Sequence, residues 1–416
     1  MTIARIASCF VLALACGLVS VGYAQTTAPA GVPGLKVDPM PTANAGEWHK
    51  ANSTHRQATF PQTTDDGRYW FQFRAPNAKS VQLEVGGHRY DYEKGADGVW
   101  NLFVPYQGPG VKLVTVYVDG VAMPEPGTDM FYSNGWKAAI ESPALGEDFY
   151  AVKDVPHGDV REHWFKSNVA GTTRRMFVYT PPGYDKDAAG RYPVLYLQHG
   201  AGEMEQEWTH SGLANFILDN LIAEKKATPM IIVMNNGFAN RPGEPPAGAR
   251  GASPGRGAPA TAPSSRGNPA PVAAFEEMLI KEIIPDIDKN FRTLADRDHR
   301  ALAGLSMGGG QAYTIGFRNL DTFSHLGIFS GAIGTVSALP EPMNNPDTFN
   351  SRVHVLLLSA GTVGSDLQFH TSAKALVDMA KAAGIHATFF ESPNTQHEWQ
   401  TWRRSLHAFA PLLFKQ

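Results

Sequence analysis

The sequence predicts an α/β fold that follows a small all-β unit. Between about residues 58 and 143, short runs of alternating apolar and polar residues are separated by Gly-Gly and Asp-Gly turns, as in a β-sandwich. From about residue 172 onward, apolar strand-like runs alternate with helical stretches, a pattern typical of a mostly parallel sheet covered on both faces. One of these strands runs into Gly304-Leu-Ser-Met-Gly308 just before a helical stretch. A serine on such a strand-to-helix turn is a candidate nucleophile, and the other candidate site residues are placed relative to it.

Composition sets broad limits. The chain has 416 residues, of which 43% are hydrophobic and 18% charged, so it is ordinary globular material for two or three domains. The formal net charge is −3. We therefore expect neither nucleic acid nor an anionic membrane surface as a partner.

Residues 1–24 read as a secretory signal peptide. Arg5 lies near the start, an apolar stretch covers 10–21, and Gly22-Tyr-Ala24 offers a small-x-small cleavage point. The apolar run is shorter than the roughly 20 residues that a membrane span needs, so cleavage is favoured over an uncleaved anchor. Both cysteines, Cys9 and Cys16, lie inside this segment. We expect a secreted or periplasmic protein with no membrane part after cleavage and no disulfide, thiol nucleophile or cysteine metal site.

Four segments follow the signal peptide in the predicted organisation. Residues 25–52 are rich in Pro, Ala, Thr and Gly and are predicted to be a flexible leader. Residues 53–145 form the β-sandwich and residues 146–416 the α/β domain, beginning with a connection over about 146–171. Inside it, residues 237–271 carry four arginines against one glutamate and no periodicity. This insertion is predicted to be a disordered loop, with a mobile basic flap over the cleft as the alternative.

The elements of the α/β domain can be placed from periodicity and length. Strands are expected over 174–180, 192–198, 230–236, 299–305, 326–330, 353–361 and 387–392. Helices are expected over 211–226, 272–290, 311–317, 372–383 and 398–413. This order is that of an α/β-hydrolase.

Ser306 is the predicted nucleophile. A sharp turn between strand and helix forces unusual backbone dihedrals on the serine, so the flanking Gly304 and Gly308 must be small. The backbone N–H of Met307 then faces the place where an oxyanion forms, and the helix N-terminus adds its positive end. The second oxyanion donor should come from the loop after the strand ending at Gln198. Ala201 is assigned there, with Gly202 as the near alternative.

Acyl transfer by serine also needs a base and an orienting acid. In α/β-hydrolases the chain order is serine, acid, histidine, so the base should lie near the C-terminus. His397 follows the last strand and fits, whereas His407, His386, His370 and His354 lie in or beside regular elements. Asp366 is the first carboxylate after the strand 353–361. It is preferred over Glu391, Glu398 and Asp378, which lie on a strand, beside the histidine and in a helix.

With these residues placed, residues of about 159–416 resemble the esterase D and carbohydrate esterase family 1 group. The motifs are Arg175-Met-Phe-Val-Tyr-Thr-Pro-Pro-Gly-Tyr184, Leu195-Tyr-Leu-Gln-His-Gly-Ala-Gly202, Gly304-Leu-Ser-Met-Gly-Gly309 and His397-Glu-Trp-Gln-Thr-Trp-Arg403. The acid, in Gly361-Thr-Val-Gly-Ser-Asp366, comes a few residues later than family members often have it. The preceding sandwich resembles early-set immunoglobulin-like modules related to carbohydrate-binding family 48. Its Trp70, Tyr92 and Trp100 could stack on sugar rings, although their alternation favours core positions.

The resemblance implies ester hydrolysis without cofactor or metal. Secreted feruloyl and acetyl-xylan esterases are the expected type, with an ester of a plant polysaccharide as substrate and feruloyl ahead of acetyl. Trp208, Trp399 and Trp402 are candidate walls for an aromatic acyl group, or simply packing residues. The alternatives are an enterochelin-type siderophore esterase, an acyltransferase with the same triad, and, least favoured, a non-enzymatic glycan-binding protein. Nothing in the sequence indicates the oligomeric state.

Overall fold

The computed structural model describes residues 47–51, 53–54, 57–132, 135–142, 144, 146–244 and 269–415. The predicted signal peptide, most of the predicted leader and most of the predicted insertion lie outside the described residues. The β part below is residues 47–142 and the α/β part is residues 146–415.

The β part consists of two antiparallel sheets. One has the order β1-β2-β3-β7-β6, and the other has the order β10-β11-β8-β4-β5, with β9 paired to β8. The strands are β1 (His49–Lys50), β2 (Gln62–Thr63), β3 (Tyr69–Arg74), β4 (Val81–Val85), β5 (His88–Asp91), β6 (Glu93–Lys94), β7 (Val99–Val104), β8 (Gly110–Val118), β9 (Val121–Pro124), β10 (Met130–Tyr132) and β11 (Trp136–Ser142).

The alternating residues of the β part meet in a single core. Phe71, Leu83 and Val116 are fully buried in it. Trp100 and Tyr92 belong to the same cluster at 6% and 5% exposure, while Trp70 is half-buried. Two of the three aromatic residues considered for sugar stacking are therefore core residues.

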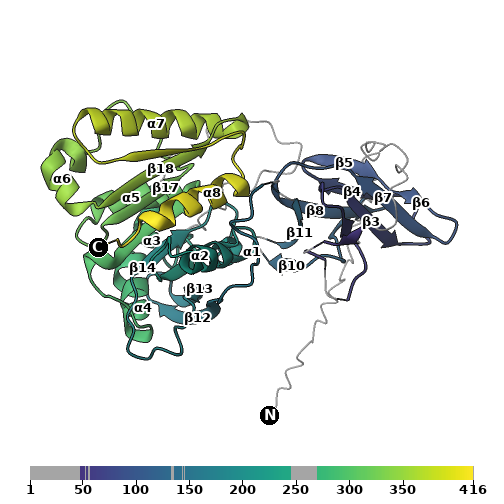
Figure 1. Ribbon diagram of the computed structural model, residues 1–416, viewed down its shortest axis with the longest axis horizontal. Coiled ribbons are helices and arrows are strands. Elements are labelled where there is room, and N and C mark those ends of the chain that lie inside the picture. Colours follow the sequence, from purple (N-terminus) through teal and green to yellow (C-terminus); the bar gives the residue numbers. More distant parts are fainter. Residues whose placement is uncertain are drawn as a thin grey trace, which may run out of the picture. The chain divides into compact units, whose positions relative to one another are not determined.

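The α/β part has one eight-stranded sheet with the order β12-β13-β15-β14-β16-β17-β18-β19 (Figure 1). β12 pairs antiparallel with β13, and β13 with β15, while all later pairs are parallel. The strands are β12 (Asp159–Ser167), β13 (Thr172–Thr180), β14 (Val194–Gln198), β15 (Ile231–Asn235), β16 (Arg300–Leu305), β17 (His325–Phe329), β18 (Val355–Gly361) and β19 (Thr388–Ser392). The parallel run brings the carboxyl ends of β14 to β19 to one edge of the sheet, which is where ligands bind in open α/β sheets.

β12 corrects the prediction of a connection over 146–171. Nine residues of that stretch form an edge strand paired along its full length with β13. Most of its side chains are exposed or half-buried, and Trp164 is 55% exposed. An edge strand with little apolar burial gives a weak period-2 signal, so the sequence pattern predicts a connection there and not a strand.

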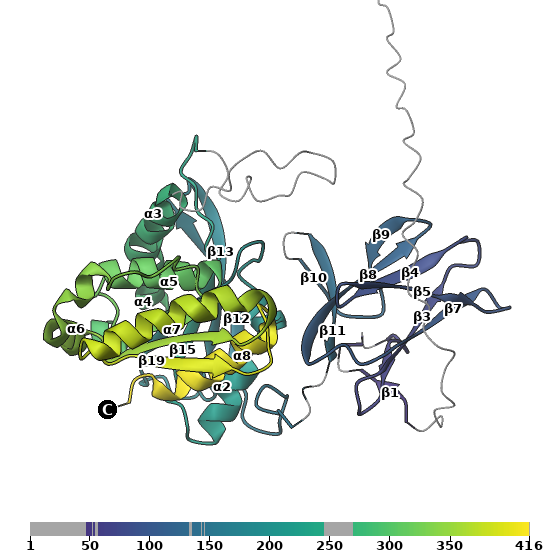
Figure 2. The ribbon, with the colours of Figure 1, turned by 90° about the horizontal axis from the view of Figure 1, so that it is seen from above.

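Helices cover both faces of this sheet (Figure 2). One apolar cluster joins one face to α3 (Pro269–Met278), α4 (Ile284–Asn290), α5 (Met307–Arg318), α6 (Pro346–Arg352) and α7 (Leu367–Ala382). A second joins the other face to α1 (Glu207–His210), α2 (Ala214–Ala223) and α8 (Trp399–Phe409). Neighbouring residues of β14 divide between the clusters, with Tyr196 in the first and Leu195 in the second. This division confirms the predicted three-layer arrangement.

Several helices differ from their predicted bounds, and α5 begins at Met307 and not at 311. α7 begins at Leu367, directly after Asp366, and not at 372. The helix predicted from 272 begins at Pro269, so the last residues of the predicted insertion are helical, and it contains a π-helical stretch over Leu279–Ile283.

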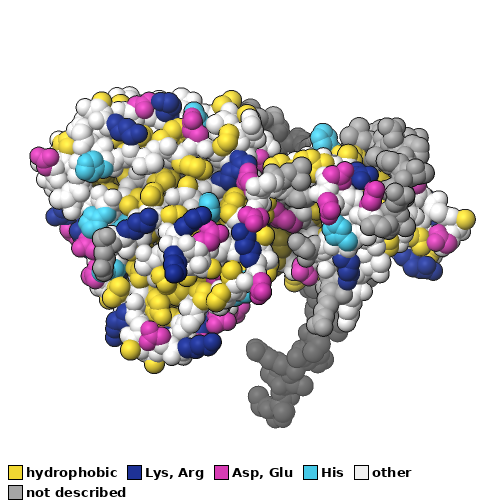
Figure 3. Space-filling model, in the orientation of Figure 1, with side chains coloured by type: hydrophobic (Ala, Val, Ile, Leu, Met, Phe, Trp, Pro, Cys, Tyr) yellow, Lys and Arg dark blue, Asp and Glu magenta, His cyan; other side chains and the backbone are white. Residues whose placement is uncertain are grey.

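The surface of the α/β part mixes charges of both signs. Lysine and arginine side chains are interspersed with aspartate and glutamate on the face shown in Figure 3, as the small net charge suggests. Among the described residues, no helix is long and apolar enough to cross a membrane.

Candidate active site

The turn between β16 and α5 holds Ser306 in a conformation that few non-glycine residues adopt. Its φ is 51° and its ψ is −112°. The turn is possible because the residues two positions before and after the serine have no side chain. A Cβ on Gly304 would lie 2.6 Å from the carbonyl carbon of Gly308, and one on Gly308 would lie 2.5 Å from the carbonyl oxygen of His199. The two glycines thus allow the strand and the helix to approach closely, as predicted.

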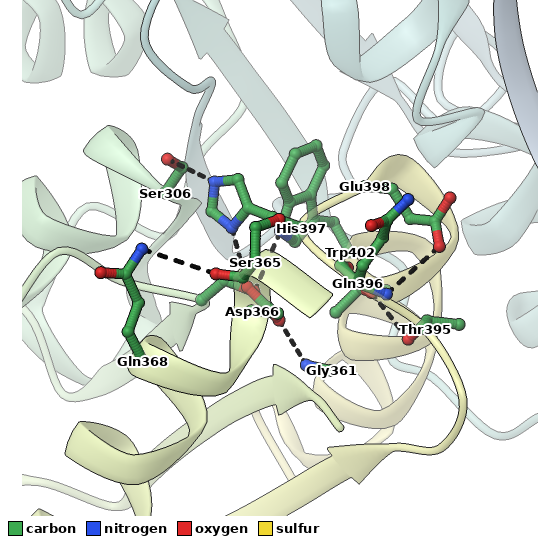
Figure 4. A network of polar contacts seen from close by, with 12 residues as sticks. Ser306, Gly361, Ser365, Asp366, Gln368, Thr395, Gln396, His397, Glu398 and Trp402 are labelled. Atoms are coloured by element: carbon green, nitrogen blue, oxygen red, sulfur yellow. Dashed lines mark hydrogen bonds and ion pairs between the residues drawn. The ribbon is translucent and has the colours of Figure 1, made fainter. Parts of the chain in front are cut away.

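Ser306, His397 and Asp366 form a chain of hydrogen bonds, in that order (Figure 4). The hydroxyl of Ser306 lies 2.9 Å from Nε2 of His397. Nδ1 of His397 lies 2.7 Å from Oδ1 of Asp366. Asp366 is an acceptor when ionised, so Nδ1 carries the proton and Nε2 is left free to accept from the serine hydroxyl. The order and the distances are those that a nucleophile, a general base and an orienting acid require.

Asp366 is fully buried and its second oxygen is also occupied. Oδ2 accepts hydrogen bonds from the backbone N–H of Gly361 and, at 2.9 Å, from the hydroxyl of Ser330. These donors fix the carboxylate plane. Sequence reasoning missed Ser330, because nothing in the sequence around it indicates that it meets a residue 36 positions away.

The three other carboxylates weighed for the acid lie elsewhere, and Asp378 pairs with Lys374 at 2.6 Å. Glu391 accepts from Nε2 of His370 at 2.7 Å, and Glu398 accepts from the backbone N–H of Gln396 at 3.2 Å. None of these contacts involves His397. The structure thus brings Asp366, and not its competitors, to the imidazole.

The predicted oxyanion donors lie on either side of the nucleophile. Met307 is the first residue of α5, so its N–H has no partner within the helix. On the other side, a Cβ built on Gly200 would be 3.5 Å from Cβ of Ser306, which places the Gly200–Ala201 peptide beside the serine. Gly202 follows with a φ of 79°. Ala201 and Gly202 are both exposed.

His199 orients this peptide. The backbone N–H of Gly237 donates to its Nε2 at 3.1 Å, so Nδ1 carries the proton and donates to the carbonyl oxygen of Gly200 at 2.8 Å. Burial lowers the pKa of His199 to about 4, which keeps the ring neutral at physiological pH. In a trans peptide the N–H points away from the C=O. Holding the Gly200 carbonyl therefore aims the Ala201 N–H in the opposite direction.

Glu203 secures the other side of the same loop. Its Oε2 accepts from the backbone N–H of Gly200 at 2.7 Å. Burial, followed by the nearby charge of Glu207, raises the pKa of Glu203 to about 8. His199 and Glu203 together restrain both peptides of Gly200.

Aromatic rings enclose the imidazole of His397. Phe369 stacks on it with ring centroids 4.6 Å apart and planes 20° apart. Trp402 meets it edge to face at 5.0 Å. These contacts hold the ring in place and offer an aromatic face to the imidazolium that forms during catalysis.

The three tryptophans considered as acyl-group walls lie in one cluster. Trp399 contacts both Trp208 and Trp402 edge to face at 5.2 Å. Trp208 is 1% exposed and donates its indole N–H to the carbonyl oxygen of Gln198, and Trp402 is 5% exposed. Because both rings are enclosed by protein, they act as packing residues. Only Trp399 is partly exposed.

Among the described residues, no group of three or more His, Cys, Asp and Glu side chains is arranged to hold a metal ion.

The strained serine follows a parallel strand and is hydrogen bonded to a histidine, and the histidine is hydrogen bonded to a buried aspartate; both partners follow later strands. This arrangement defines an α/β-hydrolase. Residues 167–413 match the family model described as "Putative esterase", and the chain belongs to this family.

Two curated relatives are similar in sequence. A protein of Xylanibacter ruminicola named endo-1,4-beta-xylanase/feruloyl esterase is 38% identical over 367 residues, which are 86% of this chain and 46% of that protein. An esterase of Mycobacterium tuberculosis is 30% identical over 156 residues, which are 35% of this chain and 26% of that protein. The chain thus spans about half of the first relative's length and less of the second's.

Two solved structures are similar in fold. A CE1 ferulic acid esterase from Anaeromyces mucronatus, in complex with ferulic acid, has a TM-score of 0.52 and 26% identity, over 64% of this chain and 96% of that one. The enterobactin esterase of Shigella flexneri has a TM-score of 0.56 and 15% identity, over 88% of this chain and 95% of that one. The second likeness is one of fold alone.

Proposed function

We propose that this chain hydrolyses feruloyl esters of xylan-type plant polysaccharides through an acyl-enzyme on Ser306. The observation that carries the proposal is the hydrogen-bonded chain from Ser306 through His397 to Asp366, in a sequence 38% identical to a protein named for feruloyl esterase activity. The likeness to a ferulic acid esterase solved with ferulic acid supports the same acyl group.

In the acylation step, Nε2 of His397 takes the proton of the Ser306 hydroxyl as the oxygen attacks the ester carbonyl. The carbonyl oxygen becomes an oxyanion between the N–H groups of Met307 and Ala201. Collapse of this intermediate breaks the bond to the sugar oxygen, which receives the proton from His397 and leaves as a hydroxyl. The feruloyl group then remains bonded to Ser306.

In the deacylation step, water takes the place of the sugar. His397 removes a proton from the water as it attacks the acyl carbonyl, and returns that proton to the Ser306 oxygen when the second intermediate collapses. Asp366 keeps the imidazole in the productive tautomer and stabilises its positive charge in both steps.

We also propose that the protein is exported, as secreted or periplasmic esterases are. This proposal depends on residues 1–24 alone, whose composition is that of a signal peptide. An intact-mass measurement of the protein purified from its culture medium or periplasm tests it, because cleavage after Ala24 would leave Gln25 as the first residue.

The test of the activity is a substrate panel with a nucleophile control. Purified protein is assayed on methyl ferulate, acetylated xylan and a catecholate siderophore ester, beside Ser306→Ala. We expect methyl ferulate to give the highest kcat/KM, and the variant to lose several orders of magnitude. Preference for the siderophore ester would replace the proposed substrate class, and wild-type turnover by Ser306→Ala would refute the mechanism.

A further inference from the structure

Ser330, at the end of β17, has an unusual backbone and an unusual set of partners. It is fully buried, and its φ is 44°, in the left-handed region that favours glycine. A serine that persists in this conformation indicates that its side chain has a task, since glycine would fit the backbone with less strain.

Its hydroxyl has a single proton, and the neighbouring groups decide where that proton points. The indole N–H of Trp402 is a donor only, and it lies 3.1 Å from Oγ of Ser330. The hydroxyl oxygen accepts this bond and is left with its own proton for Oδ2 of Asp366, at 2.9 Å. Trp402, Ser330, Asp366 and His397 are therefore linked by hydrogen bonds that converge on Asp366, with Ser330 donating to one carboxylate oxygen and His397 to the other (Figure 4 shows the Trp402, Asp366 and His397 members).

The backbone around Ser330 is bonded to the nucleophile as well. The N–H of Ser306 donates to the carbonyl oxygen of Phe329 at 2.9 Å, and the N–H of Ala332 donates to the carbonyl oxygen of Ser306 at 3.1 Å. The N–H of Ser330 itself donates to the carbonyl oxygen of Ser359 on β18 at 2.7 Å. Segment 329–332 thus holds the nucleophile by its backbone and the acid by one side chain.

We propose that Ser330 is a positioning residue for the reaction, which couples the geometry of the Ser306 turn to the carboxylate of Asp366. Its hydroxyl fixes the rotation of the carboxylate, so that Oδ1 stays directed at Nδ1 of His397 while the Ser306 turn is held by the same segment. The left-handed backbone of Ser330 is what turns the side chain toward Asp366. This inference rests on the proposed role of the three residues in ester hydrolysis.

The test is Ser330→Gly, chosen because glycine keeps the backbone conformation and removes only the hydroxymethyl group. A hydrogen bond to a charged group contributes enough that its loss should lower kcat for a small aryl ester by about tenfold to a hundredfold. KM should change by less than about twofold, since Ser330 is buried and does not reach substrate. The thermal midpoint should fall little, because relief of the backbone offsets the lost bond.

A second readout separates positioning from a structural role. The proton between Nδ1 of His397 and Asp366, which lie 2.7 Å apart, should give a far-downfield resonance in the proton NMR spectrum of the resting enzyme. In Ser330→Gly this resonance should shift or broaden, because the acceptor loses one of the donors that fix it. A merely structural serine would move the thermal midpoint and leave the resonance unchanged.

Ser359→Ala is the matched control. Its hydroxyl is equally buried and donates to Oγ of Ser405 at 2.8 Å, away from Asp366. The control should keep the wild-type kcat and resonance. Ser330→Ala, which keeps the Cβ, should resemble Ser330→Gly in kcat but be less stable, because alanine remains strained at this φ.

Wild-type kcat and an unshifted resonance in folded Ser330→Gly would overturn the inference while leaving the proposed function intact, provided that Ser306→Ala is inactive. Failure of both Ser330 variants to fold would also overturn it, because the hydroxyl would then be needed for the fold itself. Activity that survives Ser306→Ala would remove the proposed function and this inference together.

Discussion

Asp366→Asn is expected to lower kcat by about 10²–10⁴ while leaving KM nearly unchanged. The size of the effect follows from the two sides of the carboxylate. Oδ1 accepts from His397, and Oδ2 accepts from the Gly361 N–H and the Ser330 hydroxyl. An asparagine side chain can present its oxygen to only one of these sides.

The backbone donor of Gly361 cannot turn around, so the amide oxygen is drawn to it and the NH₂ group faces His397. That orientation favours the imidazole tautomer with its proton on Nε2, which cannot accept the proton of Ser306. In the reverse orientation the asparagine NH₂ group faces the backbone N–H of Gly361, so two donors meet in a buried site, which costs about 1–3 kcal/mol. Loss of the charged acceptor for the imidazolium adds about 1.5–3 kcal/mol. The sum corresponds to about two to four powers of ten in rate.

Steady-state kinetics on methyl ferulate and on a small aryl ester measure the effect. KM should hold because Asp366 is fully buried and cannot touch substrate. The control is Asp378→Asn on α7, the helix that follows Asp366, where the carboxylate is exposed and pairs with Lys374. A kcat for Asp366→Asn within a factor of three of the wild type would refute the assignment of the acid.

Three further outcomes are expected. Gly308→Ala should cost about 1–3 kcal/mol of stability, because the added Cβ would lie 2.5 Å from the carbonyl oxygen of His199; an unchanged midpoint in urea denaturation would contradict this. His199→Ala should lower kcat by about 10²–10³, as loss of one oxyanion donor does, because the Gly200 carbonyl loses its tether; single-turnover rates on an aryl ester would show it, and a change confined to KM would not fit. Burial, and then the charge of His354, lowers the pKa of His325 to about 3. The unfolded chain therefore binds the extra proton first, so stability should fall as the pH drops below about 6.5, by up to about 1.4 kcal/mol per pH unit from this group. Urea titrations at several pH values give the free energy of unfolding as a function of pH. This free energy should fall less steeply toward low pH in His325→Gln, and an equal fall in both proteins would refute the linkage.

The sequence by itself determined the chemistry of the site and most of the elements that carry it. Gly304 and Gly308 indicate the strained turn at Ser306, because only bare backbone allows that approach. The apolar runs indicate the parallel strands β14 to β18, since strands whose residues are almost all buried give strong signals. The chain order of serine, acid and histidine then leaves few candidates for the partners, and the structure brings Asp366 and His397 to Ser306.

Only the tertiary structure decided which side chains face one another. His397 and Ser306 are 91 positions apart, and Ser330 and Asp366 are 36 apart. Periodicity indicates that a residue is buried but not what it meets, so the hydroxyl of Ser330 and the ring of Phe369 gave no signal, and the sequence leaves Trp208 open between a wall for the acyl group and a packing residue. The sequence pattern does not predict β12, because this edge strand buries few apolar side chains and is held mainly by backbone pairing with β13. Contacts between distant segments form only when the whole sheet is assembled, so a local sequence pattern cannot predict them.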